Sequence, residues 1–554
     1  MGYHGRILLE DVIGAPMKRT LGIVLDYPPE VLTNAHGLSR LLMFLIKGCS
    51  DSGNKVVILC PEWCRIDLSR LFIEFNIPER KDYITIQSTG SHFPVLSLYY
   101  WFTQWREKPK HPSILRQFNV ALKERVARSI AKIGSSTSWV TIFLITLLCI
   151  LLIPVIALVF LGYLMFKLIL VFSDGSQTSK GTTFANKIFS NIGEPLHTYR
   201  KNQIFLNIFR MMNRHECRQL ARLANEQKDI GAWLIPTPFW PELVQQIHNS
   251  VVVCPDTVIT DFPVGFVLED IYDLTIDRKI IIGQSFRAAK KIITYSNYVK
   301  YFQVVERFGI SEAHIEVIPH GHISLVESLK ILKPFDTLNS DEKRDLCLQI
   351  LHNYTRAHVS NTYLKTFNFS GTKFLVFTSQ GRPHKNLSLL IRAFHRLLWE
   401  RHEPIKLVLT VDTHDQPDIQ KLIEKLGITR DVVILSNLPN QIMAALNHLS
   451  ALAVNPTLFE GGFPFTFSEA YSVGTPSVMS RIPVVEEVIT DQKLQKVMLF
   501  DPYNIDDMVE HIYWGLHHRD ELFDLQKHFY SHLKERSWAQ VAQEYKNVLD
   551  QIGV

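Results

Sequence analysis

The 554-residue sequence lacks the short motifs of several large enzyme classes. It contains no G-x-x-x-x-G-K-[ST] phosphate loop, no G-x-S-x-G nucleophile elbow, no Asp-x-Asp pair and no Cys-x-x-Cys pair. These absences argue against a P-loop nucleotide hydrolase, an α/β-hydrolase and a zinc finger. The 22 His residues are dispersed; His320 and His384 lie beside motifs described below, as loop residues or as substrate contacts.

Cysteine is scarce, and a strong net charge is absent. Seven Cys residues are scattered through the chain, which is typical of a protein from a reducing compartment. Lys and Arg number 59 against 54 Asp and Glu, and the resulting net charge of +5 is too mild to indicate a nucleic-acid-binding protein. The N-terminus has no basic flank followed by an apolar signal core, so we expect a catalytic body in the cytosol.

The composition predicts a folded chain of two or three domains. An apolar fraction of 46% with 20% charged residues argues against extensive disorder. Residues 20–60 predict a strand, a loop, a helix and a buried strand, which is the opening βαβ unit of a doubly wound sheet. Gly37 falls at the carboxyl end of the first strand, where ligands bind in such sheets; a structural turn is the alternative.

A long apolar segment interrupts this pattern. Aromatic residues cluster first, a basic amphipathic helix is predicted at 115–133, and residues 139–172 are nearly all apolar. The apolar run exceeds the roughly 20 residues that one membrane crossing requires, and Pro154 divides it into halves. An ordinary surface helix and a soluble core helix are the alternatives. Because both flanks belong to one sheet, we expect a re-entrant hairpin in an insert at about 92–205, attached to the membrane through about 96–172, with its ends on the cytoplasmic face.

The α/β pattern resumes after the insert. Buried-strand patterns end at Asp256 and at Ser296, and a strand at 315–321 closes the first domain. Helix capping and turn formation are the alternative roles for Asp256 and Asp261. The stretch 324–372 is polar and poorly periodic, and it predicts an interdomain linker with some helix.

An anion site is predicted where the second α/β pattern begins. A strand at 373–378 is followed by Gly381, Arg382 and Lys385 and then by an apolar helix. Two fixed cations beside the N–H groups of a helix start can bind a phosphate, whereas solvated surface cations are the alternative. The strand and helix alternation then continues and predicts a second parallel sheet.

Two acids bracket a glycine-containing loop in this second domain. Glu460 and Glu469 enclose the stretch Gly461-Gly462-Phe463-Pro464-Phe465, and Ser468 is predicted to cap a helix that starts at Glu469. N–H groups at a helix start attract anions, and carboxylates accept hydrogen bonds from the hydroxyls of a sugar or a ribose. The loop is therefore predicted to hold a glycosyl unit beside a phosphate; a solvated connection is the alternative.

These motifs resemble, in order and spacing, those of the retaining glycosyltransferases of family 4. The resemblance covers about 20–60 and 230–550. It implies that Arg382 and Lys385 contact the donor diphosphate, Glu460 the sugar and Glu469 the ribose. Eight residues separate the two acids here, where the family usually has seven. Asp256 joins the implied catalytic set, and the other implied donor-binding positions are Gly37, Ser296, Gly381, Asn437, Leu438, Gly462, Phe463, Pro464 and Phe465.

The resemblance also implies an architecture and an activity. The implied fold is α/β, with two Rossmann-like doubly wound domains of the GT-B type; the apolar run adds a hydrophobic helical hairpin inserted in the first domain. We expect domains at 1–345 and 346–535, and a C-terminal helix at 536–554 that returns to the first domain, since Trp538 resembles the start of the family's closing helix. The implied activity is retaining transfer of a sugar from a nucleoside diphosphate to a hydroxyl. The lack of an Asp-x-Asp pair adds the expectation of metal independence, and the hairpin adds that of a membrane-bound glycan or glycolipid as the acceptor. No cofactor and no nucleic-acid partner are expected.

Two other functions are weighed against this one. A membrane-attached scaffold or regulator that binds a sugar nucleotide without turnover is the alternative to an enzyme. The presence of Arg382, Lys385, Glu460 and Glu469 speaks against it, because a protein without turnover has no physical need for all four. A transporter is disfavoured, since one hairpin cannot form a pathway by itself.

Overall fold

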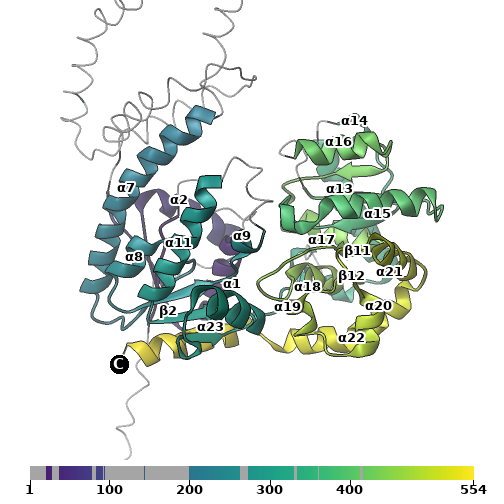
Figure 1. Ribbon diagram of the computed structural model, residues 1–554. Helices are drawn as coiled ribbons and strands as arrows, with labels where there is room; N and C mark the ends of the chain where they lie inside the picture. The colour runs from purple at the N-terminus through teal and green to yellow at the C-terminus, as the bar shows by residue number, and fades with distance from the viewer. Residues whose placement is uncertain are drawn as a thin grey trace, which may run out of the picture.

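The computed structural model describes residues 20–27, 37–77, 83–91, 93, 143, 199–262, 272–329, 334–359, 361–411 and 416–553. Over these residues the chain forms two α/β domains (Figure 1), as the sequence predicts. The hairpin at 139–172 and most of the insert at about 92–205 lie outside the described residues. Among the helices of the described ranges, none combines the length and the apolarity that a membrane crossing needs.

The first domain contains a seven-stranded parallel sheet in the order β3-β2-β1-β4-β5-β6-β7. Its side chains alternate between two buried faces: Leu21 and Ile23 of β1 join one apolar cluster and Val24 the other. The two faces explain why the strands are almost continuously apolar. The strands are β1 (Thr20–Val24), β2 (Lys55–Cys60), β3 (Ile84–Ser88), β4 (Trp233–Ile235), β5 (Ser250–Cys254), β6 (Lys291–Thr294) and β7 (Ile315–Val317).

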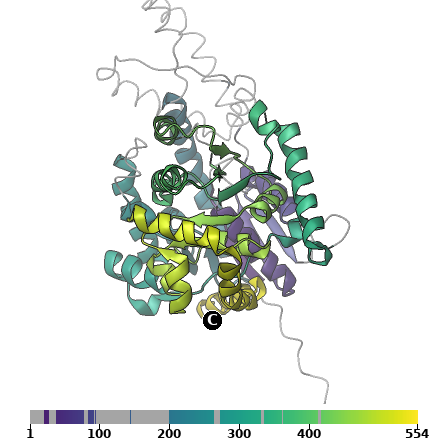
Figure 2. The same cartoon turned by 90° about the vertical axis from the view of Figure 1, so that its right-hand side faces the viewer.

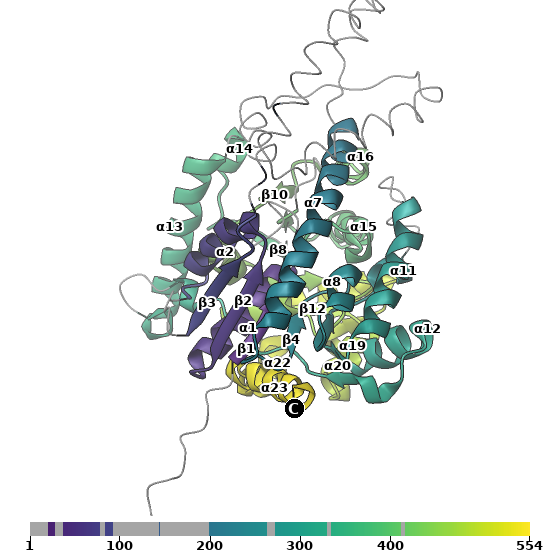
Figure 3. The ribbon, with the colours of Figure 1, turned by 90° about the vertical axis from the view of Figure 1, so that its left-hand side faces the viewer.

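Helices cover both faces of this sheet. One face carries α1 (Gly37–Asp51), α2 (Glu62–Glu74) and the C-terminal helix α23 (Trp538–Ile552). The other carries α7 (Tyr199–Glu226), α8 (Pro241–Gln246) and α11 (Tyr272–Ala288), as Figure 3 shows for α7 beside β1 and β4. Shorter elements are α9 (Val258–Asp261), the π-helix η1 (Val299–Val305), α12 (Glu306–Phe308) and the 3-10 helix η2 (Glu312–His314).

The second domain contains a six-stranded parallel sheet in the order β10-β9-β8-β11-β12-β13. It too has an apolar cluster on each face, with Leu375 of β8 in one and Phe374 in the other. In Figure 2 this domain, in green and yellow, lies in front of the purple strands of the first domain. The strands are β8 (Lys373–Phe377), β9 (Ile405–Leu409), β10 (Val432–Ile434), β11 (Leu452–Asn455), β12 (Ser477–Ser480) and β13 (Leu499–Phe500).

The helices of the second domain begin before its first strand. They are the 3-10 helices η3 (Val326–Leu329), η4 (Phe335–Thr337) and η5 (Pro383–Lys385), and α13 (Ser340–His358), α14 (Thr362–Lys365), α15 (Leu387–Trp399), α16 (Pro417–Lys425), α17 (Asn440–Leu449), α18 (Phe465–Ser472), α19 (Pro483–Glu486), α20 (Gln492–Met498), α21 (Ile505–His517) and α22 (Arg519–Glu535).

The structure corrects the predicted linker at 324–372 and the predicted boundary at 345/346. That boundary falls inside α13, which starts with a capping box of Asn339 and Glu342 and packs against α17. Leu325, Leu329 and Phe335 are already buried in the core of the second domain. Because most positions of α13 are polar and only a few are buried, the composition of this segment resembles that of a linker.

The chain returns to the first domain through α23, which lies beneath that domain in Figure 1 and packs against α1. The two helices meet at Gly48, where a Cβ atom would overlap the carbonyl oxygen of Trp538 and lie 2.5 Å from its carbonyl carbon. Trp538 also stacks on Phe44 of α1, with ring centroids 5.3 Å apart. Glycine at position 48 therefore sets how closely the C-terminal helix approaches.

Replacing Gly48 by Ala tests this contact. The added methyl group meets backbone atoms that cannot rotate away, so we expect the free energy of unfolding to fall by about 1–3 kcal/mol. Urea unfolding followed by circular dichroism measures the change. Lys47→Ala, on the exposed side of the same helix, is the control and should change stability by less than about 0.5 kcal/mol. Equal stability of the two variants would contradict the contact.

Candidate functional site

The carboxyl ends of both sheets face one another where the two domains meet, and this interdomain interface is called the cleft below. Loops that follow β5 and β6 contact the loop that follows β11 and helix α18. Within the second sheet β8 and β11 are neighbours, so the loops that follow them, which carry Lys385 and Glu460, are adjacent. Side chains that are far apart in the sequence therefore meet at this edge.

Lys385, Glu460 and Asp256 form the centre of the site. The Lys385 ammonium donates a short hydrogen bond to Glu460 Oε1, and the two side chains are only 15% and 19% exposed. A Cβ atom at the neighbouring Gly461 would lie 3.0 Å from Asp256 Cβ, so the acid of the first domain abuts the loop of the second. Burial raises the pKa of Asp256; Glu460 raises it further, while Lys385 and Arg382 lower it. Asp256 thus lies within electrostatic range of the other three charged groups.

The loop after β8 carries positive charge. Arg382 is exposed, and its Nε donates to Gln380 Oε1 at 3.0 Å. Burial, with Lys385 and Arg382 adding to it, lowers the pKa of His384 to about 3, so this ring is neutral. The backbone of His384 instead connects this loop to the loop after β11 that carries Glu460, called the acidic loop below. The His384 carbonyl accepts from the N–H of Leu458 at 2.7 Å. Two cations thus stand where an anionic ligand can meet them.

Glu469 lies inside helix α18 and not at its start. Helix α18 begins at Phe465 with Pro464 at its N-cap, so the prediction that Ser468 caps a helix starting at Glu469 is wrong by one helical turn. Proline fixes the backbone angle that starts the helix earlier. The Glu469 carboxylate is nearly buried and accepts a short hydrogen bond from Arg40 of helix α1, across the cleft.

Several other contacts hold the cleft closed. Ser296 Oγ donates to the carbonyl of Gly461 at 2.9 Å, so this side chain is occupied by an interdomain contact. A Cβ atom at Gly462 would lie 2.7 Å from His320 Nε2, and a Cβ atom at Gly461 would overlap the carbonyl oxygen of Pro255. The Glu487 carboxylate accepts from the backbone N–H of Asn297 at 2.8 Å. Both glycines therefore permit a backbone approach that no other residue allows.

The aromatic residues of the acidic loop pack rather than face the cleft. Phe463 contacts Phe467 and Phe529 of the second-domain core, at 5.8 and 5.4 Å between ring centroids. Phe465 lies against His320, at 4.7 Å, and Trp538, at 6.3 Å. Only the backbone of these positions and of the buried Pro464 is left to meet a ligand.

The remaining candidates lie along the two edges. Asn437, exposed and left-handed with φ 55°, and Leu438 follow β10, three strand spacings or roughly 14 Å from β11. At Gly381 a Cβ atom would overlap Gln416 and lie 2.6 Å from Val411 Cγ1, so the backbone there is closely approached. Gly37 opens α1 and is exposed, and no atom of the described residues lies within 4 Å of the position of a Cβ.

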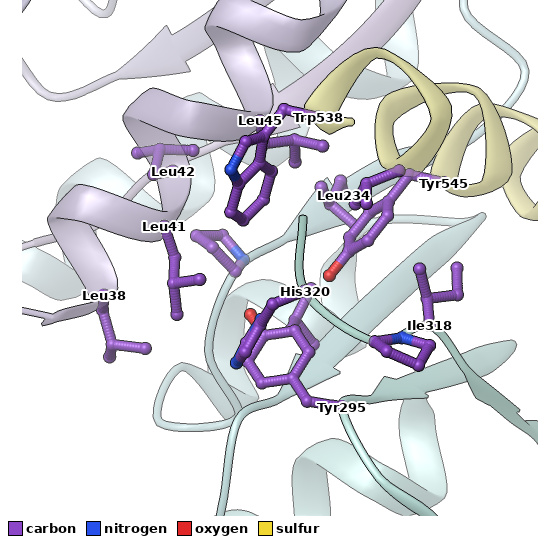
Figure 4. A pocket seen from close by; sticks show the side chains of 14 residues that line it. Leu38, Leu41, Leu42, Leu45, Leu234, Tyr295, Ile318, His320, Trp538 and Tyr545 are labelled. Carbon is purple, nitrogen blue, oxygen red and sulfur yellow. The ribbon is translucent and has the colours of Figure 1, made fainter. Parts of the chain in front are cut away.

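A small cavity lies beside the cleft, between α1, α23 and the loop after β7 (Figure 4). Its volume of about 20 Å³ is enough for roughly one water molecule. Leu41, Leu45, Tyr295, His320 and Trp538 are among the residues that line it. Burial lowers the pKa of His320 to about 3, so the imidazole is neutral. The cavity is part of the packed seam and is too small for a nucleotide or a sugar.

Two buried carboxylates fasten α7 to the carboxyl edge of the first sheet. Asp26, which follows β1, accepts a short hydrogen bond from Asn213 and another from Cys217 at 3.1 Å. Glu216 accepts from Thr89 at 2.5 Å. Burial raises the pKa of Asp26 to about 7, although both hydrogen bonds lower it. The helix that leads out of the insert is thus held by groups whose charge depends on pH.

Asp26→Asn tests this attachment. The unfolded chain releases the Asp26 proton near pH 4 and the folded chain near pH 7, so the contribution of this group to stability is complete below pH 4 and is lost as pH rises to about 7. Asn keeps the shape without ionising. We therefore expect the variant to gain about 1–3 kcal/mol in unfolding free energy relative to the wild type between pH 5 and pH 8, measured by urea unfolding. A constant difference would contradict the shifted pKa.

Sequence reasoning missed three residues that the structure brings to the cleft. Arg40 carried no motif, although one Arg close behind Gly37 could have signalled a cation at the start of α1. The Glu487 carboxylate accepts from a backbone N–H of the first domain, and Pro255 approaches the second domain through its own backbone carbonyl. No sequence pattern predicts contacts of this kind. Asp261 is occupied within the first domain, where it binds Arg307 and Gln303. Within the described ranges, no three His, Cys, Asp or Glu side chains are grouped to hold a metal ion.

Known proteins are similar to this chain in sequence and in fold. Residues 362–534 match the family model of the glycosyl transferases group 1. An MMP alpha-(1->4)-mannosyltransferase from Mycolicibacterium hassiacum is 32% identical over 136 residues. That match covers 24% of this chain and 32% of the relative, so the chain spans about a third of that relative's length.

Two solved structures share the architecture. The N-terminal domain of trehalose-6-phosphate phosphatase from Candida albicans has a TM-score of 0.52 at 11% identity, covering 100% of this chain and 99% of its own. HepE from Anabaena, in complex with UDP and glucose, has a TM-score of 0.52 at 10% identity, covering 96% of this chain and 100% of its own. The two parallel-sheet domains therefore form a GT-B type fold, as the sequence predicts.

Proposed function

We propose that the chain is a retaining glycosyltransferase that moves a sugar from a nucleoside diphosphate to a hydroxyl of a membrane-bound glycan or glycolipid, on the cytoplasmic side of the membrane. The observation that carries the proposal is the meeting of Lys385, Glu460 and Asp256 where the carboxyl edges of two parallel sheets face each other. The match of residues 362–534 to the glycosyl transferases group 1 supports the reaction class.

The cations act on the leaving group. When the bond between the anomeric carbon and the donor phosphate breaks, negative charge grows on the diphosphate and positive charge on the sugar. Lys385 exchanges Glu460 for a phosphate oxygen, and Arg382 binds a second one. The N–H groups at the start of α15 add to this field. Fixed charges of this kind usually contribute more to the rate than any other feature of such a site.

The acids act on the two sugars. Glu460, once released by Lys385, accepts hydrogen bonds from the transferred sugar and faces its oxocarbenium-like carbon. Glu469 accepts from the ribose hydroxyls, and Asp256 lies beside the reacting carbon from the other domain. The acceptor oxygen forms its bond on the face that the diphosphate leaves, and its proton passes to the departing phosphate oxygen. Closure of the cleft keeps water away from the donor.

The flanks of the insert support a membrane-bound acceptor. Thr89, before the insert, donates to Glu216, after it, and the rings of Phe93 and His215 lie 6.1 Å apart. The chain therefore leaves and returns at one point on the carboxyl edge of the first sheet, which is the side of the cleft. Deletion of residues 139–172 should abolish membrane association, whereas a soluble deletion that stays fully active on lipid acceptors would exclude a role for the hairpin.

A donor screen followed by a transfer assay tests the function. We expect one of the UDP-, GDP- or ADP-sugars to raise the unfolding temperature of the full chain, because a ligand of the native state stabilises it. That sugar should then be transferred to a lipid-linked acceptor with retained configuration, and EDTA should not change the rate. Glu469→Ala is the control and should lose donor binding. Donor binding without any product would favour the scaffold over the enzyme.

A further inference from the structure

Helix α1 contributes a cation to the cleft that no motif identifies. Arg40 extends from the first turns of α1 in the first domain to Glu469 of α18 in the second, 429 residues away in the sequence. The Arg40 side chain is 24% exposed and the Glu469 side chain 5%. An ion pair with so little contact with water is not a loose surface pair, and separating it leaves both charges in need of new partners.

Two hydrogen-bond donors at this ion pair, one of them on Arg40 itself, have no acceptor in the described structure. Arg40 Nε is buried without a hydrogen-bond partner, and so is the hydroxyl of its neighbour Ser39, which is 1% exposed. Buried donors are normally satisfied, so a pair of unsatisfied ones at one helix start points to an acceptor that is supplied from outside. Both lie where the N–H groups of α1 also favour negative charge.

The charges of the cleft are balanced among themselves. Lys385 binds Glu460, Arg40 binds Glu469, and in the described part of the chain Arg382 donates to the neutral Gln380. A ligand that needs either acid must therefore displace a cation. Neutral hydroxyls that take Glu469 from Arg40 would leave a guanidinium unpaired, which is unfavourable unless the same ligand brings negative charge.

We propose that Arg40 is a positioning and specificity residue that exchanges partners when the donor binds. Before the donor binds, its guanidinium pairs with the Glu469 carboxylate, in the place that the ribose hydroxyls take later. As the ribose hydroxyls take the carboxylate, Arg40 and Ser39 turn to the diphosphate and join Arg382 and Lys385 from the opposite domain. The exchange makes the release of Glu469 from Arg40 depend on the diphosphate, so a nucleoside alone binds poorly. This inference rests on the proposed function and identifies the ligand feature that its site selects.

The test compares two probes on the full chain by calorimetric titration. The probes are the nucleoside diphosphate that stabilises the wild type, UDP, GDP or ADP, and the nucleoside it contains. Arg40→Gln should bind the diphosphate about 10- to 100-fold more weakly, because a charged hydrogen bond is lost, and the nucleoside about 3- to 10-fold more tightly, because Glu469 is free. Arg40→Lys, which keeps the charge but not the forked donor, should shift both affinities less and in the same two directions.

Arg382→Gln is the matched control, since Arg382 is hydrogen-bonded to Gln380 and not to Glu460 or Glu469. It should weaken binding of the diphosphate and leave the nucleoside unchanged. If both Arg40 variants move the two affinities in one direction, or move neither, the pair is a structural bridge between the domains and the inference is overturned. If the wild type binds none of the nucleotides, the proposed function fails first, and this inference with it.

Discussion

Replacing Lys385 by Ala is expected to lower kcat for sugar transfer by about 100- to 1000-fold, with a smaller change in KM. The ammonium is held beside Glu460 in a nearly buried position, where a positive charge acts more strongly than in water. Its attraction to the diphosphate is strongest when the diphosphate departs and carries its full charge. The loss should therefore fall on the transition state more than on the bound donor.

Steady-state kinetics on the donor identified by the screen measure this effect. Lys385→Arg should recover part of the rate, since it restores the charge in a different shape. Lys421→Ala removes an exposed Lys from the same domain, 74% exposed and away from the cleft, and should leave kcat unchanged. A Lys385→Ala enzyme with raised KM but unchanged kcat would show that Lys385 binds donor and transition state equally, against the proposed role.

Replacing Gly461 by Ala should lower kcat by about 100-fold or more while the protein stays folded. The added methyl group would overlap the carbonyl oxygen of Pro255 in the other domain, and backbone atoms cannot rotate away. The domains would have to separate by part of an ångström or more, and misplacement of about 1 Å costs roughly 100-fold in rate. The contact lies between the domains and not inside the core of either one, so the unfolding temperature should change little.

Gly283→Ala is the control for this substitution. Gly283 lies in α11, and a Cβ atom there would meet the flexible end of Arg287 at 3.1 Å. Alanine also suits a helix better than glycine, so stability and activity should both be kept. Full activity of Gly461→Ala would show that transfer does not require the closed approach of Pro255 to the acidic loop.

The order and type of most elements follow from local patterns in the sequence. Apolar strands alternate with amphipathic helices, which predicts two parallel sheets, and the structure confirms them. The anion motif at 381–385 lies in the loop after β8 and Glu460 in the loop after β11, so their common edge was predictable. The C-terminal helix packs on α1, and Trp538 at its start stacks on Phe44.

Other features depend on contacts that local patterns do not contain. The predicted boundary at 345/346 was wrong because the polar helix α13 buries only a few positions against α17. Phe463 and Phe465 lie in a loop that predicted ligand contacts, yet their rings pack into the core and the domain seam. In each case the deciding partner lies in a distant part of the chain.

The sequence by itself determined the two folds and the chemical types of the groups at their edges, because strand and helix periods and turn residues are local properties. Only the tertiary structure decided which groups are paired: Arg40 with Glu469, Lys385 with Glu460, and Gly461 with Pro255. The physical reason is that these contacts arise from the docking of one domain on the other, which depends on shape and charge summed over residues hundreds of positions apart.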